Sequence, residues 1–217
     1  MQLAEQLQLE PAQHTLVQPC YANREYPWLA LKRFDWVSNQ EGPAGRLHMH
    51  SACGLLGADF RLPSLDYQTL ISATRRLCKS PAAAQLQFRR AVFNLLASNQ
   101  DDHSKNWAFL QSDDGGWQPA PFYDVTFSPG RFGEHATAFG GYGKNPPLKA
   151  LQKLAAEAGY ANWRQARQEI QRVLDALAGF SSMATEFGVS VETTRLIQQQ
   201  LDHTYQQNSG LLVSSSE

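Results

Sequence analysis

The apolar residues of the chain recur with a helical period over much of its length. A helix expected over 82–98 has its apolar side chains on one face and its polar side chains on the other, so it should dock on a core. The apolar set is Phe88, Val92, Leu95 and Leu96, and the polar set is Gln87, Arg90 and Asn94. The same period predicts helices over 1–9, 64–78, 147–158, 163–177 and 191–205.

Short extended segments interrupt this helical pattern near the N-terminus and in the middle of the chain. Residues 14–19 and 27–36 predict a small hairpin-like unit, and the second segment alternates enough to be a half-buried strand. Residues 107–111 and 117–125 predict a second hairpin, because an Asp-Gly-Gly turn lies between them. This hairpin returns the chain to the point where its first strand begins.

Two other stretches are predicted to be irregular. Residues 41–63 contain several glycines and have no clear period, which predicts a loop. Residues 208–217 are predicted to form a flexible tail. Since the chain has no internal repeat and no low-complexity linker, the pattern predicts one mainly α domain with short β elements.

The composition is that of a folded chain with nearly balanced charge. Of its 217 residues, 42% are hydrophobic, which is ample for a core. The net charge of -1 excludes a protein whose whole surface binds polyanions. The apolar runs are far shorter than the roughly twenty residues that cross a bilayer, and the N-terminus does not read as a signal peptide, so we expect no membrane and a cytoplasmic location. Cys20, Cys53 and Cys78 are widely spaced and odd in number, which supports neither a disulfide framework nor a thiolate zinc site.

A polar cluster lies between the helix over 82–98 and the second hairpin. Its sequence, NQDDHSKN over 99–106, is ordinary for a surface loop. The returning strand of the hairpin, however, should bring Asp124 beside Asn106. Carboxylate and carboxamide oxygens are the ligands of a hard cation such as Mg²⁺, which usually takes one or two carboxylates together with substrate phosphates.

The spacing within this cluster favours phosphoryl transfer. In that chemistry an Asp accepts the substrate hydroxyl proton, an Asn five residues later holds a metal, and a later Asp holds the metal on the nucleotide phosphates. Asp101, Asn106 and Asp124 have this order and spacing. Lys105 could neutralise charge on the transferring phosphoryl group, and His103 could bind a phosphate or brace the loop.

These residues resemble the signature of the HipA-type serine/threonine kinases, the toxins of bacterial HipA/HipB toxin and antitoxin pairs. The residues that carry the resemblance are Asn99, Asp101, His103, Lys105 and Asn106, followed by Phe122, Tyr123 and Asp124. The segments LALKRFDW (29–36), LAEQLQLEPA (3–12) and AFGGYGKN (138–145) are also similar to the family, the last being more typical of a turn than of a phosphate loop. The similarity extends over almost all of this chain but over only the C-terminal half of a full-length family member.

The resemblance implies a role for each matching residue. Asp101 would be the catalytic base, and Asn106 and Asp124 would be Mg²⁺ ligands. His103, Lys105 and Tyr123 would be nucleotide-site residues, with Lys105 also acting in catalysis. The linker between the two lobes would be Lys32, Arg33 and Phe34, whose backbone groups would meet the adenine of ATP.

The resemblance also implies a protein-kinase-like C-terminal lobe over 1–207, with the start of the lobe and the linker over 1–36, a helical lobe over 64–207 and a catalytic hairpin over 99–125. The N-terminal lobe, with its phosphate-covering loop and strand lysine, is expected to be largely missing. The implied cofactors are ATP and Mg²⁺. The implied partners are a protein substrate and either an antitoxin-like HipB-type protein or a complementing N-terminal lobe, with DNA reached only through such a partner.

Two other functions are compatible with the same residues. The first is a noncatalytic, pseudokinase-like module that binds an antitoxin-like partner. The second is a metal-dependent hydrolase using Asp101, Asp102 and His103, although the chain shows no second His ligand at a fixed spacing. Asp102 is expected to be exposed to solvent. His48 and His50 are expected to be incidental. The basic side chains of the two middle helices are expected to form a solvated face; they are Arg75, Arg76, Lys79, Arg89 and Arg90.

Overall fold

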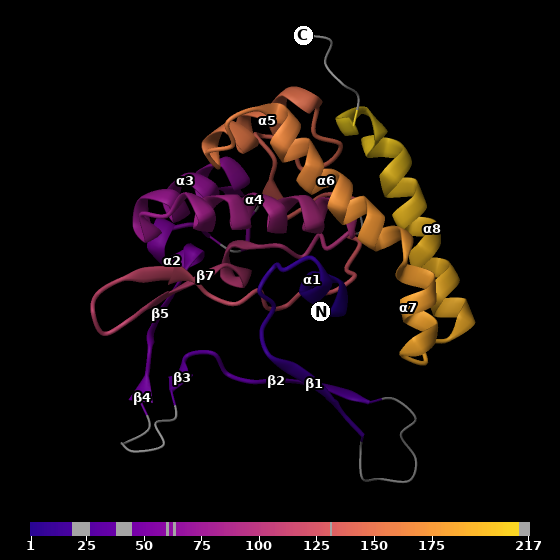
Figure 1. Ribbon diagram of the computed structural model, residues 1–217, viewed down its shortest axis with the longest axis horizontal. Coiled ribbons are helices and arrows are strands. Elements are labelled where there is room, and N and C mark those ends of the chain that lie inside the picture. The colour runs from indigo at the N-terminus through magenta and orange to yellow at the C-terminus, as the bar shows by residue number, and fades with distance from the viewer. Residues whose placement is uncertain (19–26, 38–44, 60, 63, 131, 213–217) are drawn as a thin grey trace.

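The computed structural model describes residues 1–18, 27–37, 45–59, 61–62, 64–130 and 132–212, and it has a large helical part with short strands (Figure 1). The helices are α1 Gln2–Gln6, α2 Ala52–Leu56, α3 Tyr67–Cys78, α4 Pro81–Leu96, α5 Leu148–Glu157, α6 Trp163–Ala178, α7 Phe180–Glu186 and α8 Val191–Asn208. Two short 3-10 helices are η1 Ser104–Asn106 and η2 Ser209–Leu212. The predicted helices are confirmed, and α7 was not expected.

Local sequence signals explain where the long helices begin. The Asp66 side chain accepts a hydrogen bond from the backbone of Gln68 at the start of α3. Ser80 caps α4 in the same way, and Pro81 occupies its first turn, where the missing N–H carries no penalty. Asn162 and Ser190 cap α6 and α8. These caps satisfy backbone donors that the helices themselves cannot pair.

Helix α4 forms the centre of the core, because α3, α5, α6 and α8 all pack against it. The polar side chains of this helix therefore do not face solvent, contrary to the amphipathic pattern. Gln87, Arg90 and Asn94 are only 0%, 2% and 1% exposed. Asn94 donates to the Tyr67 hydroxyl at 2.9 Å. For Arg90 and Asn94, hydrogen bonds inside the lobe thus replace the water that an amphipathic pattern leads one to expect.

Among the described residues, the strands form four small sheets. The paired strands are β1 His14–Val17 with β2 Trp28–Leu31, β3 Trp36–Val37 with β4 Gly45–Arg46, and β6 Leu65–Asp66 with β9 Thr137–Ala138, and the three-stranded sheet has the order β5 His48–Ser51, β7 Ala108–Gln111, β8 Trp117–Pro119. The second hairpin is confirmed as β7–β8, although its returning strand is shorter than expected. Pro119 and Pro121 lack the N–H that a longer strand would need.

Much of the predicted loop over 41–63 is instead β4, β5 and α2, so that prediction is wrong for 45–56, whereas the described residues 57–59 and 61–62 form turns and irregular structure. Strand β5 pairs antiparallel with β7, with Met49 opposite Leu110. Its sequence, HMHS, has no apolar alternation, and the pairing partner lies far along the chain. Only tertiary contact makes this segment a strand.

The hairpin of β1 and β2, called here the apolar ribbon, projects from the helical part (Figure 1). Cross-strand pairing puts Leu16 opposite Leu29 and Val17 opposite Trp28, so apolar side chains lie on both faces. Leu16, Leu29 and Trp28 are 48%, 48% and 50% exposed. The pairing confirms the predicted hairpin-like unit, but β2 is more exposed than the half-buried strand expected.

The chain remains packed beyond the boundary expected at residue 207. Asn208 is the last residue of α8, and Leu211 in η2 is only 3% exposed. Arg167 of α6 donates to the carbonyl of Leu212 at 3.3 Å. Residues 208–212 therefore belong to the lobe, while the rest of the predicted tail lies outside the described residues.

Two predictions from composition can be compared with the described residues. Within them, no helix is both long enough and apolar enough to span a membrane. Cys53 and Cys78 are free thiols, whereas Cys20 lies outside the described residues. Burial raises the pKa of the Cys78 thiol to about 11, so this cysteine is an unreactive thiol at neutral pH.

Candidate active site

The hairpin returns Asp124 to the polar loop, as its length predicts. The side-chain nitrogen of Asn106 donates to the Asp124 carboxylate and to the Asp101 carbonyl, both at 2.8 Å. Its amide oxygen is then available for a ligand, as is the second carboxylate oxygen of Asp124. Both are hard oxygen donors on exposed or half-buried side chains, which fits Mg²⁺.

The segment leading into Asp124 is held in a less common backbone conformation. Asp124 has φ +55°, in the left-handed region that few residues other than glycine adopt. The neighbouring Tyr123 hydroxyl donates to the Lys105 carbonyl at 2.5 Å and ties the hairpin to the loop. Burial, together with the nearby charge of Asp124, raises the pKa of Tyr123 to about 12, so the hydroxyl stays protonated and remains a donor at neutral pH. Strain of this kind occurs where surrounding contacts impose it, often at functional sites.

Asp101 has its backbone fixed and its carboxylate open to solvent. Its N–H donates to the Ser128 hydroxyl at 3.3 Å, and that hydroxyl donates to Asn99 at 2.9 Å. The Asp101 side chain is 63% exposed, and the nearest ring nitrogen of His103 lies 3.7 Å from its Oδ1. A substrate hydroxyl can therefore reach the carboxylate.

Asp102 is buried, so the prediction that it is exposed is wrong. Its residue is 1% exposed, and its carboxylate accepts hydrogen bonds from the Tyr67 hydroxyl at 2.6 Å, the His135 Nδ1 at 2.9 Å and the Thr137 N–H at 3.1 Å. The Asp102 carbonyl also accepts from Trp107 Nε1 at 3.1 Å. The loop is thereby anchored to the core immediately beside Asp101.

This buried network contains residues that sequence reasoning missed as parts of the site. Burial and the charge of Asp102 raise the pKa of Tyr67 well above its usual value, so Tyr67 remains a donor to the carboxylate. Asn94 donates to Tyr67 and accepts from Asn99, each at 2.9 Å, which links the core helix to the loop. No local pattern marks His135 or Thr137 as partners, because they lie more than thirty residues from Asp102.

A comparison with protein families decides what kind of domain this is. The sequence matches the family described as the HipA-like C-terminal domain over residues 1–180. The chain belongs to that family. The match confirms the resemblance seen in the loop and hairpin residues.

Two similar proteins are named as kinases, and a solved structure of a HipA complex has a similar fold. The chain is 33% identical over 118 residues to the putative kinase Y4mE of Sinorhizobium fredii, covering 50% of this chain and 27% of that protein. It is 43% identical over 49 residues to the serine/threonine-protein kinase toxin HipA of Shewanella oneidensis, covering 22% of this chain and 11% of that one. A structure described as HipA, HipB and operator DNA from S. oneidensis MR-1 matches with TM-score 0.63 at 20% identity, covering 99% of this chain and 57% of that chain.

These matches establish the fold as the kinase-like fold of HipA, restricted to its C-terminal domain. The chain spans just over half of the matched HipA chain and smaller shares of the two curated relatives. The predicted fold class is therefore confirmed. The roles of single residues remain predictions.

The expected interlobe linker of the HipA-like domain lies partly beside the site. The Phe34 ring packs on Tyr123, with ring centroids 5.4 Å apart. Arg33 instead pairs with both Asp35 oxygens, at 2.9 and 2.5 Å, and this bond lowers the pKa of Asp35. Lys32 uses its N–H in pairing with the Gln13 carbonyl. Adenine contact by Lys32, Arg33 and Phe34 remains a prediction.

The other histidine and basic candidates contribute no second metal or anion site in the described residues. The rings of His48 and His50 stack 6.1 Å apart, and no group of three or more His, Cys, Asp or Glu there could hold a metal ion. The Asp102 carboxylate accepts hydrogen bonds from buried groups, so it cannot ligate a metal together with Asp101. This argues against the metal-dependent hydrolase. Arg90 is buried, so the expected solvated basic face does not include it.

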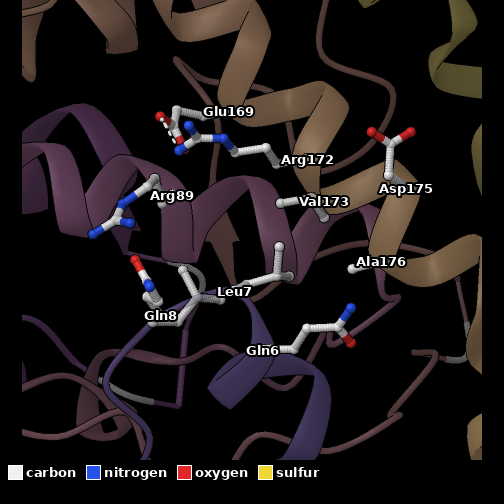
Figure 2. Close-up of a pocket in the computed structure, with 10 residues that line it drawn as sticks. Gln6, Leu7, Gln8, Arg89, Glu169, Arg172, Val173, Asp175 and Ala176 are labelled. Carbon is white, nitrogen blue, oxygen red and sulfur yellow. Dashed lines mark hydrogen bonds and ion pairs between the residues drawn. The ribbon is translucent and has the colours of Figure 1, made fainter.

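A cavity of about 460 Å³ lies away from the loop, between α1, α4 and α6 (Figure 2). Leu7 and Val173 line it together with charged side chains. Arg172 donates to Glu169 at 3.1 Å across its edge. None of the loop or hairpin candidates lines this cavity.

Proposed function

We propose that this HipA-like domain is the catalytic lobe of an ATP- and Mg²⁺-dependent serine/threonine protein kinase of the HipA type. The single observation that carries the proposal is the contact between Asn106 and Asp124, at 2.8 Å, with Asp101 on the same loop. One carboxylate and one carboxamide suffice for Mg²⁺ when nucleotide phosphates supply further oxygens. Bound there, Mg²⁺ would neutralise charge on those phosphates.

We assign the remaining residues the roles that the resemblance to the HipA family implies. Asp101 accepts the proton of a serine or threonine hydroxyl. The hydroxyl oxygen bonds to the γ-phosphorus of ATP while the bond between that phosphorus and the ADP oxygen breaks. Lys105, exposed on the same loop, neutralises charge on the transferring group. His103 and Tyr123 face the nucleotide, and the Asp102 network holds the loop still while this occurs. Positioning of this kind supplies most of the catalysis in phosphoryl transfer.

A second lobe is needed to cover the nucleotide, and the apolar ribbon supports this. A lone two-stranded hairpin is marginally stable in water, and this one exposes leucines on one face and Trp28 on the other. Such a surface is expected to be covered by neighbouring structure. We propose that an N-terminal lobe, in a longer form of this chain or in a separate chain, covers the ribbon and supplies the phosphate-covering loop.

Titration with Mg·ATP tests the kinase proposal. Asp124→Asn is expected to weaken Mg·ATP binding about tenfold or more, because the variant loses the anionic metal ligand. NMR titration of the full chain detects weak binding, which we expect without the second lobe. Asp113→Asn, an exposed acid in the hairpin turn, is the control and should bind like the wild type. Equal affinity of Asp124→Asn and the wild type would contradict the proposal.

Dye binding tests the exposed ribbon. Replacing both Trp28 and Leu29 by threonine keeps strand propensity but removes apolar surface. The fluorescence of the hydrophobic dye ANS with the full chain should then fall by about half or more, with the unfolding free energy changed by less than about 1 kcal/mol. Leu196→Thr, on exposed α8, should alter the fluorescence little. An unchanged signal in the ribbon variant would show that the ribbon is not an exposed apolar surface.

A noncatalytic module is the second candidate function. The matched S. oneidensis HipA structure is described as a complex with HipB and operator DNA. By analogy, the domain would bind an antitoxin-like protein and reach DNA only through it, in keeping with its net charge of -1. Nucleotide binding that is indifferent to Asp124→Asn would favour this module over the kinase.

A further inference from the structure

A polar cavity of about 390 Å³ borders the candidate active site. It lies among residues 129–130 and 132–133, residues 144–145 and the last turns of α8. We call it the amide pocket, defined by Gln100, His135, Asn145, Gln200, Gln207 and Asn208. Five of these six side chains are carboxamides.

Two buried polar side chains in the amide pocket have unused bonding capacity. Asn208 is 7% exposed; its Nδ2 donates to the Thr204 carbonyl at 2.9 Å, but its Oδ1 is buried with no hydrogen-bond partner among the described residues. The His135 side chain is 2% exposed, and its Nδ1 is held by Asp102. Its Nε2 is thus the ring nitrogen that Asp102 does not engage. Buried polar atoms are nearly always paired, so this acceptor calls for a donor from outside the described residues, either a water molecule or an occupant of the pocket.

The amide pocket is lined by Gln100 of the polar loop over 99–106, the loop that carries Asp101. Gln100, which lines the pocket, immediately precedes Asp101, and its Oε1 accepts from the Gly130 N–H at 2.6 Å. His135 reaches the same loop from the other side through the Asp102 carboxylate. A segment bound in the pocket would therefore lie against the loop that carries Asp101.

The lining chemistry suits a neutral polar polypeptide. Carboxamides both donate and accept, as peptide groups do. No acidic side chain lines the pocket in the described part of the chain, and Lys144 at its edge pairs with Glu134 at 3.6 Å. Lys144 and His203 also line the pocket, so the site does not suit a cation, and its carboxamides, which are most of its polar side chains, suit peptide groups. Phe132 at the rim, 76% exposed, adds an apolar surface for a side chain of the segment.

We propose that the amide pocket binds an extended, neutral polar segment of the polypeptide substrate next to its phosphoacceptor residue. This inference rests on the proposed kinase function, because it assigns the pocket to that reaction's protein substrate. It assigns the recognition of residues beside the phosphoacceptor to α8, Gly130 and Phe132 rather than to the metal site.

An array of short peptides with a fixed central serine and varied flanks tests the pocket without any need for phosphoryl transfer. Gln207→Trp in the full chain fills the pocket, whereas Gln206→Trp puts the same ring one residue away on α8, outside it. Both residues are exposed, so equal melting temperatures are expected. Peptides retained by the wild type should bind about tenfold or more weakly to Gln207→Trp and unchanged to Gln206→Trp.

Retained peptides that bind Gln207→Trp as well as the wild type would overturn the inference, as would an array from which the wild type retains no peptide. Asp124→Asn keeps the two proposals apart. It should leave peptide binding intact while weakening Mg·ATP binding. Peptide binding that depends on Gln207, combined with Mg·ATP binding that ignores Asp124, would reject the kinase function and leave the pocket as a polypeptide site.

Discussion

Asp102→Ala is expected to lower the free energy of unfolding by about 3–5 kcal/mol, the range for breaking a buried ionic hydrogen-bonded group. The substitution removes the acceptor of the Tyr67 hydroxyl, the His135 ring and the Thr137 N–H, all inside the lobe. Each donor would then be buried without a partner, which carries most of the penalty. Urea unfolding followed by circular dichroism measures the change, provided that the slope with denaturant stays the same.

Asp101→Ala is the matched control for this experiment. The two aspartates are adjacent, but the Asp101 side chain is 63% exposed and makes no buried bond with its carboxylate. Its substitution should change the unfolding free energy by no more than about 0.5 kcal/mol. If both variants lost equal stability, the buried network would not be what anchors the loop.

Arg90→Met is expected to lower the free energy of unfolding by about 2–4 kcal/mol. The guanidinium is almost completely buried and donates to the carbonyls of Leu9 at 3.0 Å and Ala120 at 3.1 Å. Methionine keeps the apolar volume but leaves these carbonyls without a donor. Burial lowers the pKa of Arg90 to about 9, which still leaves it cationic at pH 7.

The same substitution should loosen the site as well as the fold. Arg90 joins the N-terminal segment to the hairpin, and Phe122, next to Tyr123 in that hairpin, donates its N–H to the Glu10 carbonyl. Hydrogen exchange of the Phe122 amide should therefore speed up in Arg90→Met. Arg89→Met, one residue earlier on α4 but only half-buried, should leave both stability and exchange close to the wild type. Exchange at Phe122 that is unchanged in Arg90→Met would contradict this coupling.

Features that depend on neighbours along the chain were predictable from the sequence. Helices α3, α4, α6 and α8 follow from apolar period and caps, because both act within a few residues. The contact of Asn106 with Asp124 follows from hairpin length, since two short strands joined by a tight turn must return to their origin. The proximity of the two candidate metal ligands was therefore predictable from local sequence, although contacts of Arg90 and Glu10 with residues 120–122 hold the returning segment in place.

Features that depend on distant partners could not be predicted. Strand β5 forms because its backbone pairs with that of β7, and no pattern in the sequence HMHS indicates this pairing. The amide pocket joins α8 to the loop beside Asp101, segments about a hundred residues apart in sequence. In both cases the deciding contact is long-range, and sequence pattern carries only local information.

Two pairs of adjacent, identical residues separate what the sequence determines from what the tertiary structure decides. The sequence by itself determined that a polar loop with two aspartates follows a long helix and that a hairpin brings a third aspartate to it. Only the tertiary structure decided that Asp101 faces solvent while Asp102 is buried, and that Arg90 is interior while Arg89 is not. A side chain's burial depends on which distant donors and acceptors surround it, and residue type alone does not specify these.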